Sequence, residues 1–368
     1  RAGMTTTTAT TNTVIGSFSL DNGAANTGGL NTVIGHGAGR VITSGTNNTT
    51  LGYDAGVAIT TGTYNICIGG VGAGNTITTG SGNIAIGSSA LTTLTASTYP
   101  NIAIGENALY SMATGYQNIA IGYTAGQSAT GIGNTYIGDS AGLAGTSGNS
   151  NTSLGAASLT AITTGASNTA VGNSAGAAIT TGSHNSSLGI VAGAAITTGD
   201  KNLCLGYDAG MSGSPNHITT GDNGIVLGNN STASAHIKVD WTVTSDKRDK
   251  TDIEPLIMGL DFVNKLEPVT YRWDMRSDYS EDFSITPDGT HKQPKLLGGL
   301  LAQDVEKLER EYGYKVEDET AVLTDKHKTN GNYGLTYSKF IPVLINAVQE
   351  LSTQVDKLKQ EVATLKGE

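Results

Sequence analysis

A short repeat runs through the chain from Asn12 to Gly228 and limits what this part can fold into. An asparagine is followed four residues later by a glycine, with an aliphatic residue just before that glycine. Intact copies begin at Asn12, Asn31, Asn48, Asn65, Asn83, Asn101, Asn118, Asn134, Asn151, Asn168, Asn185 and Asn202, and a degenerate copy runs from Gly224 to Gly228. A period of about 17 residues is too short for a helix pair or a propeller blade, but it suits one coil of two short strands and two glycine turns. The spacing predicts a parallel β-solenoid.

Two more marks recur in phase with the asparagine. Ala-Gly or a variant follows it by seven residues, as at Ala55-Gly56, and Ile-Thr-Thr-Gly closes many units, as from Ile59 to Gly62. The glycine after each strand can adopt the positive φ of a tight corner. The asparagine can bond its own neighbouring backbone or form a ladder with its copies in adjacent coils.

The residues of each strand alternate between two faces. Ile84 and Ile86 share one face and Ala85 lies on the other, because strand side chains alternate with a period of two. The aliphatic face is expected to stack isoleucine on isoleucine. The face of small residues is expected to pack closely against another chain, which favours an oligomer. Cys67 and Cys204 hold equivalent positions eight coils apart, so we expect two small core residues and no disulfide between them.

Composition excludes several classes of function. The net charge is −10 and no basic stripe is present, which argues against binding nucleic acid. No apolar run approaches the roughly 18 residues that a membrane-spanning helix needs, so no membrane insertion is expected. The histidines and aspartates of the repeats lack metal-ligand spacing, so neither a metal nor another cofactor is expected. The acidic residues are too scattered for the paired carboxylates of a glycan-degrading shaft.

After residue 244 the chain becomes charged and amphipathic. A helix is predicted over 257–266, a turn into a strand over 267–273, and a short strand running into a helix over 297–306. The longest helix starts near Ile341, and its apolar residues recur at alternating spacings of three and four, which predicts a coiled coil over 341–366. Those residues are Leu344, Val348, Leu351, Val355, Leu358, Val362 and Leu365. Valine and leucine in these places favour a dimer, whereas the small-residue face favours three chains.

The boundary between the two regions carries a possible chemical site. Ser245 precedes Lys250 by five residues, and a lysine stripped of water can accept a proton from a serine hydroxyl and make it a nucleophile. Taken alone, this spacing is common and more often marks a solvated linker.

The flanking residues change that interpretation, because the region from 245 to 368 resembles the intramolecular chaperone domains of peptidase family S74, found at the ends of phage tail spikes and fibres. Four blocks carry the resemblance: Ser245-Asp246-x-Arg248-x-Lys250-x-Asp252-Ile253, Leu266-x-Pro268-Val269-x-Tyr271-x-Trp273, Gly299 to Glu306, and Tyr337 to Leu344 with Glu350-Leu351. The repeats separately resemble the β-roll heads of trimeric autotransporter adhesins.

This resemblance implies specific roles. Ser245 would be the nucleophile, Lys250 the general base, and Thr244-Ser245 the scissile bond, while Asp246, Arg248 and Asp252 would orient the pair or bridge to a neighbouring chain. The domain would trimerise, guide folding of the shaft, and cut itself off once, as a self-cleaving serine endopeptidase.

The sequence therefore predicts a mainly β, trimeric protein in three parts. A β-solenoid shaft over 1–222 precedes an exit strand and linker over 223–244 and a small α+β chaperone domain over 245–368. The expected function is that of a viral tail fibre or spike protein, assembled in a host cytoplasm and carried on the virion, where it contacts a receptor or glycan of the host surface. The alternatives are a surface adhesin of the trimeric β-roll type and an ice-binding solenoid, since threonine ladders can order water on a flat face.

Overall fold

The computed structural model describes residues 11–367, except 22, 24, 25, 96, 98, 213, 215, 239, 240, 281–284 and 327–331. The chain divides into two compact units, Arg1–Thr232 and Ala233–Glu368. The break falls inside the predicted linker, and the predicted domain boundaries at 222 and 244 stay a prediction.

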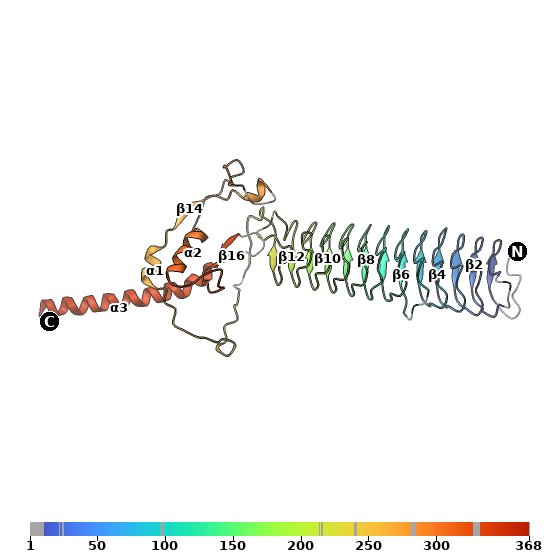
Figure 1. Cartoon of the computed structure of the whole chain (residues 1–368), viewed down its shortest axis with the longest axis horizontal. Helices are drawn as coiled ribbons and strands as arrows, with labels where there is room; N and C mark the ends of the chain where they lie inside the picture. The colour runs from blue at the N-terminus through green and yellow to red at the C-terminus, as the bar shows by residue number, and fades with distance from the viewer. Residues whose placement is uncertain are drawn as a thin grey trace. The chain divides into compact units, whose positions relative to one another are not determined.

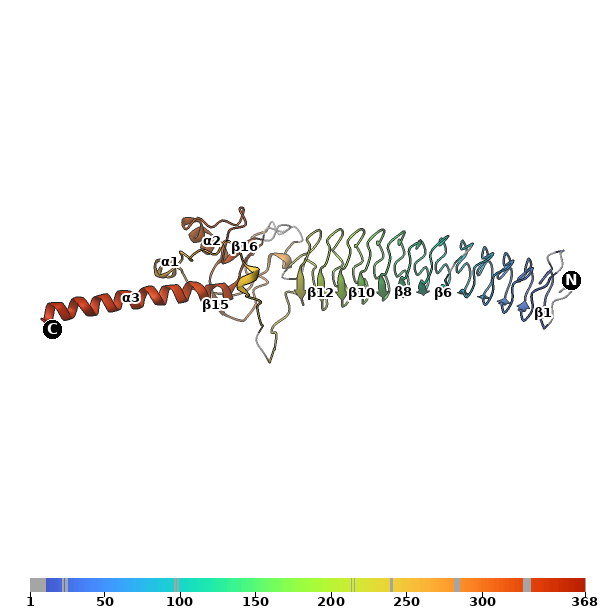
Figure 2. The ribbon, with the colours of Figure 1, turned by 90° about the horizontal axis from the view of Figure 1, so that it is seen from below.

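The first unit is the predicted β-solenoid. Thirteen strands form one parallel sheet in chain order, one strand for each copy of the repeat (Figure 1). The strands are β1 Thr13–Ile15, β2 Thr32–Ile34, β3 Thr49–Leu51, β4 Ile66–Ile68, β5 Ile84–Ile86, β6 Ile102–Ile104, β7 Ile119–Ile121, β8 Thr135–Ile137, β9 Thr152–Leu154, β10 Thr169–Val171, β11 Ser186–Leu188, β12 Leu203–Leu205 and β13 Ile225–Leu227. Figure 2 shows the same regular stack from a second side.

Each coil contributes one strand to this sheet rather than the two that the period suggested. The rest of the coil consists of turns that bond to the next coil, as where the Thr43 N–H donates to Thr60 O at 3.0 Å. Left-handed residues such as Asn47 (φ 58°) interrupt extended backbone there. The corner glycine is required for two reasons. Gly35 has a φ of +130°, which favours glycine, and a Cβ on it would lie 2.4 Å from Gly52 O.

A buried ladder of asparagines runs through the solenoid, as the repeat predicted. The Oδ1 of each asparagine before Asn202 accepts the backbone N–H of the next asparagine, as from Asn151 to Asn134 at 2.9 Å. In most coils the Nδ2 donates to a glycine carbonyl of the next coil, as from Asn134 to Gly148 O at 2.9 Å. The amides thus replace the backbone partners that a tight corner would otherwise leave unpaired inside the protein.

The aliphatic residues of adjacent coils lie side by side in register, as predicted, but the prediction that the small-residue face packs against another chain is wrong. The small middle residues point into the solenoid and are fully buried, whereas the flanking aliphatic residues point outward and are half-buried or exposed; Ala85 between Ile84 and Ile86 is one case. Small residues are needed inside because the coil is narrow. A Cβ on Gly56 would lie 2.8 Å from both Ile59 Cδ1 and Thr50 Cγ2. The strand residue, the corner glycine and the isoleucine of Ile-Thr-Thr-Gly therefore fill the same small space inside the coil. The expectation that Cys67 and Cys204 are buried core thiols is confirmed.

The eighth coil demonstrates this sharing of volume. It has Tyr136 where the other coils have alanine, cysteine, serine, threonine or valine, and Gly145 where many of them have the isoleucine of Ile-Thr-Thr-Gly. A Cβ on Gly145 would lie 3.1 Å from Tyr136 Oη, so the tyrosine fills the space that the missing isoleucine leaves. Burial raises the pKa of Tyr136, which keeps the phenol neutral.

The outward aliphatic residues form a continuous apolar row, here called the aliphatic ladder. All thirteen strands end in isoleucine, leucine or valine on the outer face: Ile15, Ile34, Leu51, Ile68, Ile86, Ile104, Ile121, Ile137, Leu154, Val171, Leu188, Leu205 and Leu227. The parallel pairing is in register, so each of these residues lies beside its equivalent in the next coil, as Leu154 lies beside Val171.

The second unit combines short strands with three α-helices. Its elements are η1 Lys247–Asp249, α1 Leu260–Lys265, β14 Val269–Tyr271, η2 Arg276–Asp278, β15 Leu297–Gly299, α2 Ala302–Glu311, β16 Thr324–Lys326, β17 Tyr333–Leu335, η3 Tyr337–Lys339 and α3 Phe340–Lys366. Strand β14 pairs with β15 and β16 pairs with β17, both antiparallel. Met258, Phe262, Val305, Leu308, Leu323, Phe340 and Val343 form the core of this unit.

The predicted helices are present, but α1 begins three residues later than the apolar pattern suggested. The carbonyls of Leu256 and Met258 both accept hydrogen bonds at 3.0 Å from Asn346 Nδ2 on α3. Because these carbonyls bond to α3 rather than within a helix, α1 begins only at Leu260.

Candidate functional site

A single 3₁₀ turn positions the residues of the predicted site. Asp246 caps the turn η1, since its carboxylate accepts the backbone N–H of Arg248 at 2.9 Å. The Arg248 guanidinium binds the same carboxylate through Nε and through Nη2, the latter at 2.6 Å. These hydrogen bonds lower the pKa of the Asp246 carboxyl below its usual value. Asp246 is therefore ionised at neutral pH and holds the turn together.

The turn brings Ser245 and Lys250 together. Lys250 closes it, with its backbone N–H donating to Lys247 O at 3.2 Å. The Lys250 Nζ lies 2.6 Å from Ser245 Oγ. This is the contact that a serine nucleophile and its general base require. Both side chains are exposed to solvent in a single chain.

The other predicted residues do not contact this pair directly. Asp246 and Arg248 bond to each other and act through the turn, while Thr244 is exposed and supplies the carbonyl of the expected scissile bond. Asp252 is exposed and has φ 50°, and no hydrogen bond joins its carboxylate to the described part of the chain.

Two residues of α3 that the sequence did not single out for a role fix the segment after the site. Asn346 binds the carbonyls of Leu256 and Met258, and Glu350 Oε2 accepts the Leu260 N–H at 2.8 Å, which caps α1. A Cβ on Gly259 would lie 2.0 Å from Glu350 Oε1, so the cap requires a glycine beside it. The turn η1 is thus linked to the long helix through ten residues of chain.

Three of the sequence blocks that carry the family resemblance meet around Gly299. Tyr337 Oη accepts the Leu300 N–H at 3.0 Å, and a Cβ on Gly299 would lie 2.6 Å from that oxygen. The same Cβ would lie 3.1 Å from Tyr271 Cε1. Blocks that are far apart in sequence therefore pack together, and residue 299 has room only for glycine.

Glu309 is a buried carboxylate that the sequence did not reveal as important. It accepts the backbone N–H groups of Val322 and Leu323 at 2.8 Å each and of Thr324 at 3.0 Å, together with the Thr324 hydroxyl. The position of Glu309 in α2 does not predict this role, because the donors lie 13 to 15 residues later, at the start of β16 and just before it.

We expect Glu309→Gln to destabilise the second unit by about 2–3 kcal/mol, because a neutral amide weakens these charge-assisted hydrogen bonds and turns its own N–H groups toward other donors. Urea unfolding monitored in this unit measures the change. The matched control is Glu311→Gln, whose exposed carboxylate contacts only Lys265 at 3.4 Å among the described residues and should alter stability by less than about 0.5 kcal/mol. Equal stability of the two variants would contradict this role for Glu309.

Within the described residues, no group of three or more histidine, cysteine, aspartate or glutamate side chains is arranged to hold a metal ion. Among the same residues, no helix is both long and apolar enough to span a bilayer.

Comparison with protein families gives one match. Residues 245–335 match the family model described as chaperone of endosialidase, Peptidase_S74. The match begins at Ser245, includes η1 and the β16–β17 hairpin, and ends before α3. Neither a curated protein nor a solved structure matches the chain. The chain thus carries a chaperone-of-endosialidase domain at residues 245–335, C-terminal to a β-solenoid, and in this it resembles a tailspike-like protein.

Proposed function

We propose that this chain is the structural protein of a viral tail fibre or spike, and that its C-terminal domain assembles the solenoid as a trimer and then releases it by cutting Thr244-Ser245. The observation that carries this proposal is the 2.6 Å contact between Lys250 Nζ and Ser245 Oγ at the first residues of the matched domain. Mass spectrometry of the purified product tests it, with two polypeptides expected, residues 1–244 and 245–368.

The chemistry follows from the position of the serine. Lys250, as the neutral amine, takes the proton from Ser245 Oγ while that oxygen attacks the carbonyl carbon of Thr244. The Lys250 ammonium then gives this proton to the amide nitrogen as the C–N bond breaks, so the nitrogen becomes the free amine of Ser245 and an ester joins Thr244 to Ser245 Oγ. Water then hydrolyses the ester, which leaves a carboxylate on Thr244 and restores the serine hydroxyl. Each chain reacts once, so the reaction is maturation rather than turnover.

Assembly supplies what a single chain lacks. The Ser245–Lys250 pair is exposed to solvent in the single chain. Removing water from this surface favours the neutral amine. Cleavage is then confined to chains that have come together, which protects unfolded chains from losing their chaperone early.

A repetitive shaft benefits from such a chaperone. Neighbouring coils make nearly identical contacts, so a slip by one coil between chains costs little and register is poorly specified. A C-terminal trimer fixes three chains in register at high effective concentration before their coils pack. After release, the shaft no longer carries the domain that nucleated its assembly. Its persistence then depends on how slowly it unfolds, so its stability is kinetic.

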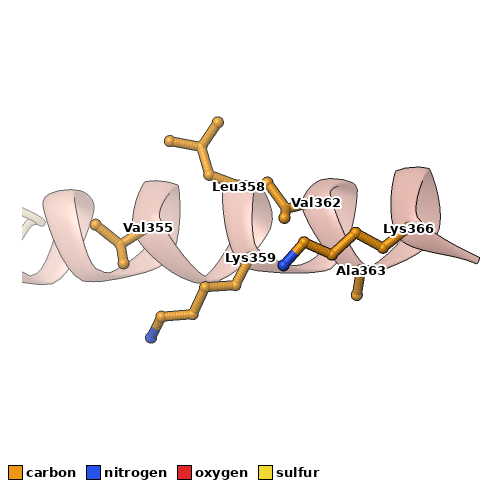
Figure 3. A pocket seen from close by; sticks show the side chains of 6 residues that line it. All are labelled: Val355, Leu358, Lys359, Val362, Ala363 and Lys366. Atoms are coloured by element: carbon orange, nitrogen blue, oxygen red, sulfur yellow. The ribbon is translucent and has the colours of Figure 1, made fainter. Parts of the chain in front are cut away.

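Two exposed apolar surfaces suit packing between copies. One is the stripe of α3, where Val355, Leu358 and Val362 lie on the last turns with Lys359 and Lys366 beside them (Figure 3). The other is the aliphatic ladder of the solenoid. It replaces the small-residue face as the contact between shafts, because that face is filled by the protein's own core. The valine and leucine pattern of α3 alone favours two chains, and the family resemblance favours three.

We expect Leu154→Lys combined with Leu188→Lys to dissociate the released shaft into single chains, because a trimer would bury both ammonium groups without partners. Light scattering of the released shaft measures its mass. The control is Thr164→Lys, an exposed residue of the same coil as Leu154 but outside the ladder, and its shaft should stay trimeric. A trimeric shaft from the doubly substituted chain would exclude the ladder as the contact.

The proposal also includes that the protein is carried on the virion and attaches to a receptor or glycan of the host surface. The ice-binding alternative is less well supported, because the first threonine hydroxyl of several Ile-Thr-Thr-Gly units already donates to the next coil. Thr163 Oγ1 donates to Thr180 O at 3.0 Å, and Thr180 Oγ1 donates to Thr197 O at 3.2 Å. The adhesin alternative has no observation that favours it over a tail fibre.

A further inference from the structure

The segment just before the expected scissile bond has an unusual surface. Ile237, Trp241 and Val243 are exposed to 54%, 76% and 79%, although each is a large apolar residue. No backbone–backbone hydrogen bond involves the described residues between 233 and 245. The described residues of this segment therefore make no backbone pairing, and they carry apolar side chains to within two residues of Ser245.

The order of these residues is that of a strand with one apolar face. Apolar and polar residues alternate from Ile237 to Val243, which in an extended chain places Ile237, Trp241 and Val243 on the same side. Aromatic and β-branched residues favour extended backbone. Trp241 and Val243 lie closest to the Thr244-Ser245 bond, so whatever binds them also fixes the path of the chain into that bond.

A second copy of the chain is the occupant that fits this face. The Ser245–Lys250 pair is open to solvent in one chain, and Trp241 and Val243 are the large exposed apolar residues that immediately precede the scissile bond. Asp246 and Arg248 already neutralise each other, so covering these two side chains does not bury an unpaired Asp246 carboxylate. Each copy brings the same segment, so identical faces can meet around one symmetry axis.

We propose that Trp241 and Val243 are positioning residues for self-cleavage: they dock against a second copy of the chain, and this contact orients the Thr244 carbonyl toward Ser245 and covers the Ser245–Lys250 pair. This inference rests on the proposed self-cleavage. It adds the residues that make cleavage depend on assembly. They touch neither reacting atom, so their effect passes through the geometry and hydration of the bond.

The test compares two substituted chains in cell-free synthesis, where cleavage is followed over time on denaturing gels. Trp241→Thr combined with Val243→Thr keeps a strand-forming residue at each place and should slow cleavage by about tenfold to a hundredfold, the cost of a poorly placed reacting group. The matched control is Ile237→Thr, a similarly exposed residue of the same face eight residues before Ser245, and it should cleave within about twofold of the unsubstituted chain. The conservative pair Trp241→Phe and Val243→Ile should restore the rate.

Assembly is measured separately so that its loss is not mistaken for loss of positioning. Each substitution is repeated on the Ser245→Ala chain, and sedimentation velocity gives its oligomeric state. The Thr-substituted pair should still assemble, since α3 and the aliphatic ladder are intact. The chain has two tryptophans, so adding Trp273→Phe to the Ser245→Ala chain leaves Trp241 as the sole reporter, and its fluorescence should shift to shorter wavelength on assembly.

Three results would overturn the inference: an assembled Thr-substituted pair that cleaves at the unsubstituted rate, the same pair failing to assemble, or Trp241 fluorescence that does not change on assembly. Failure of the unsubstituted chain to cleave is a different result, because it removes the proposed function itself.

Discussion

Ser245→Ala should leave the protein as one polypeptide of 368 residues, whereas the unsubstituted chain should separate into residues 1–244 and 245–368. Alanine has no oxygen to attack the Thr244 carbonyl, so the ester cannot form. Removal of a nucleophile from a serine–base pair costs about 10³-fold or more, so no cut should be visible on the time scale of purification. Denaturing gels and intact mass measure the result.

Substitutions of lysine distinguish a base from a structural contact. Lys250→Arg keeps a positive charge near Ser245 Oγ, but a guanidinium is always protonated and cannot accept the serine proton. It should therefore stay as uncut as Ser245→Ala. Lys247→Ala is the matched control, because Lys247 belongs to the same turn and no bond joins its side chain to Ser245 in the described chain. Cleavage of the Ser245→Ala or Lys250→Arg chain at Thr244-Ser245 would contradict the assigned roles.

Asn134→Ala should destabilise the solenoid by about 2–4 kcal/mol, because it leaves two buried groups without partners at roughly 1–2 kcal/mol each. The Asn151 N–H loses its acceptor and Gly148 O loses its donor, whereas Asn118 Oδ1 keeps the backbone N–H of residue 134. The change is measured on the Ser245→Ala chain, as the urea concentration at which the neighbouring coils lose protection from hydrogen exchange.

The control for the ladder is Asn173→Ala, an exposed corner asparagine whose amide oxygen accepts only from the neighbouring Ser174 hydroxyl at 3.1 Å among described contacts. Its stability should change by less than about 0.5 kcal/mol. If Asn134→Ala were as mild as Asn173→Ala, the buried amide ladder would not be what joins the coils.

The repeat predicts the solenoid well because each coil is a local unit whose marks recur in phase. The thirteen copies become thirteen strands, and the asparagine and corner glycine hold the places that their chemistry suggests. Which strand face is buried could not be read from hydrophobicity alone. The isoleucines are more apolar than the alanines between them, but the space inside is already taken by residues such as Ile59. The combined volume of the side chains inside one coil decides which face is buried. The pairing of Tyr136 with Gly145 shows this most clearly.

The site was partly predictable for a similar reason. Ser245 and Lys250 are five residues apart, and the Asp246 cap that folds the turn between them lies within the same short stretch. The supporting residues were not predictable, because their partners are distant in sequence. Glu350 caps a helix 90 residues earlier, and Glu309 holds a loop that no local pattern connects to it.

The cut between shaft and chaperone is the central claim, and the intact mass of the assembled, unsubstituted protein measures it in one step. We expect two species, one ending at Thr244 and one beginning at Ser245, with the Ser245→Ala chain intact beside them. An assembled protein that keeps the mass of all 368 residues, or one that is cut at another bond, would contradict it.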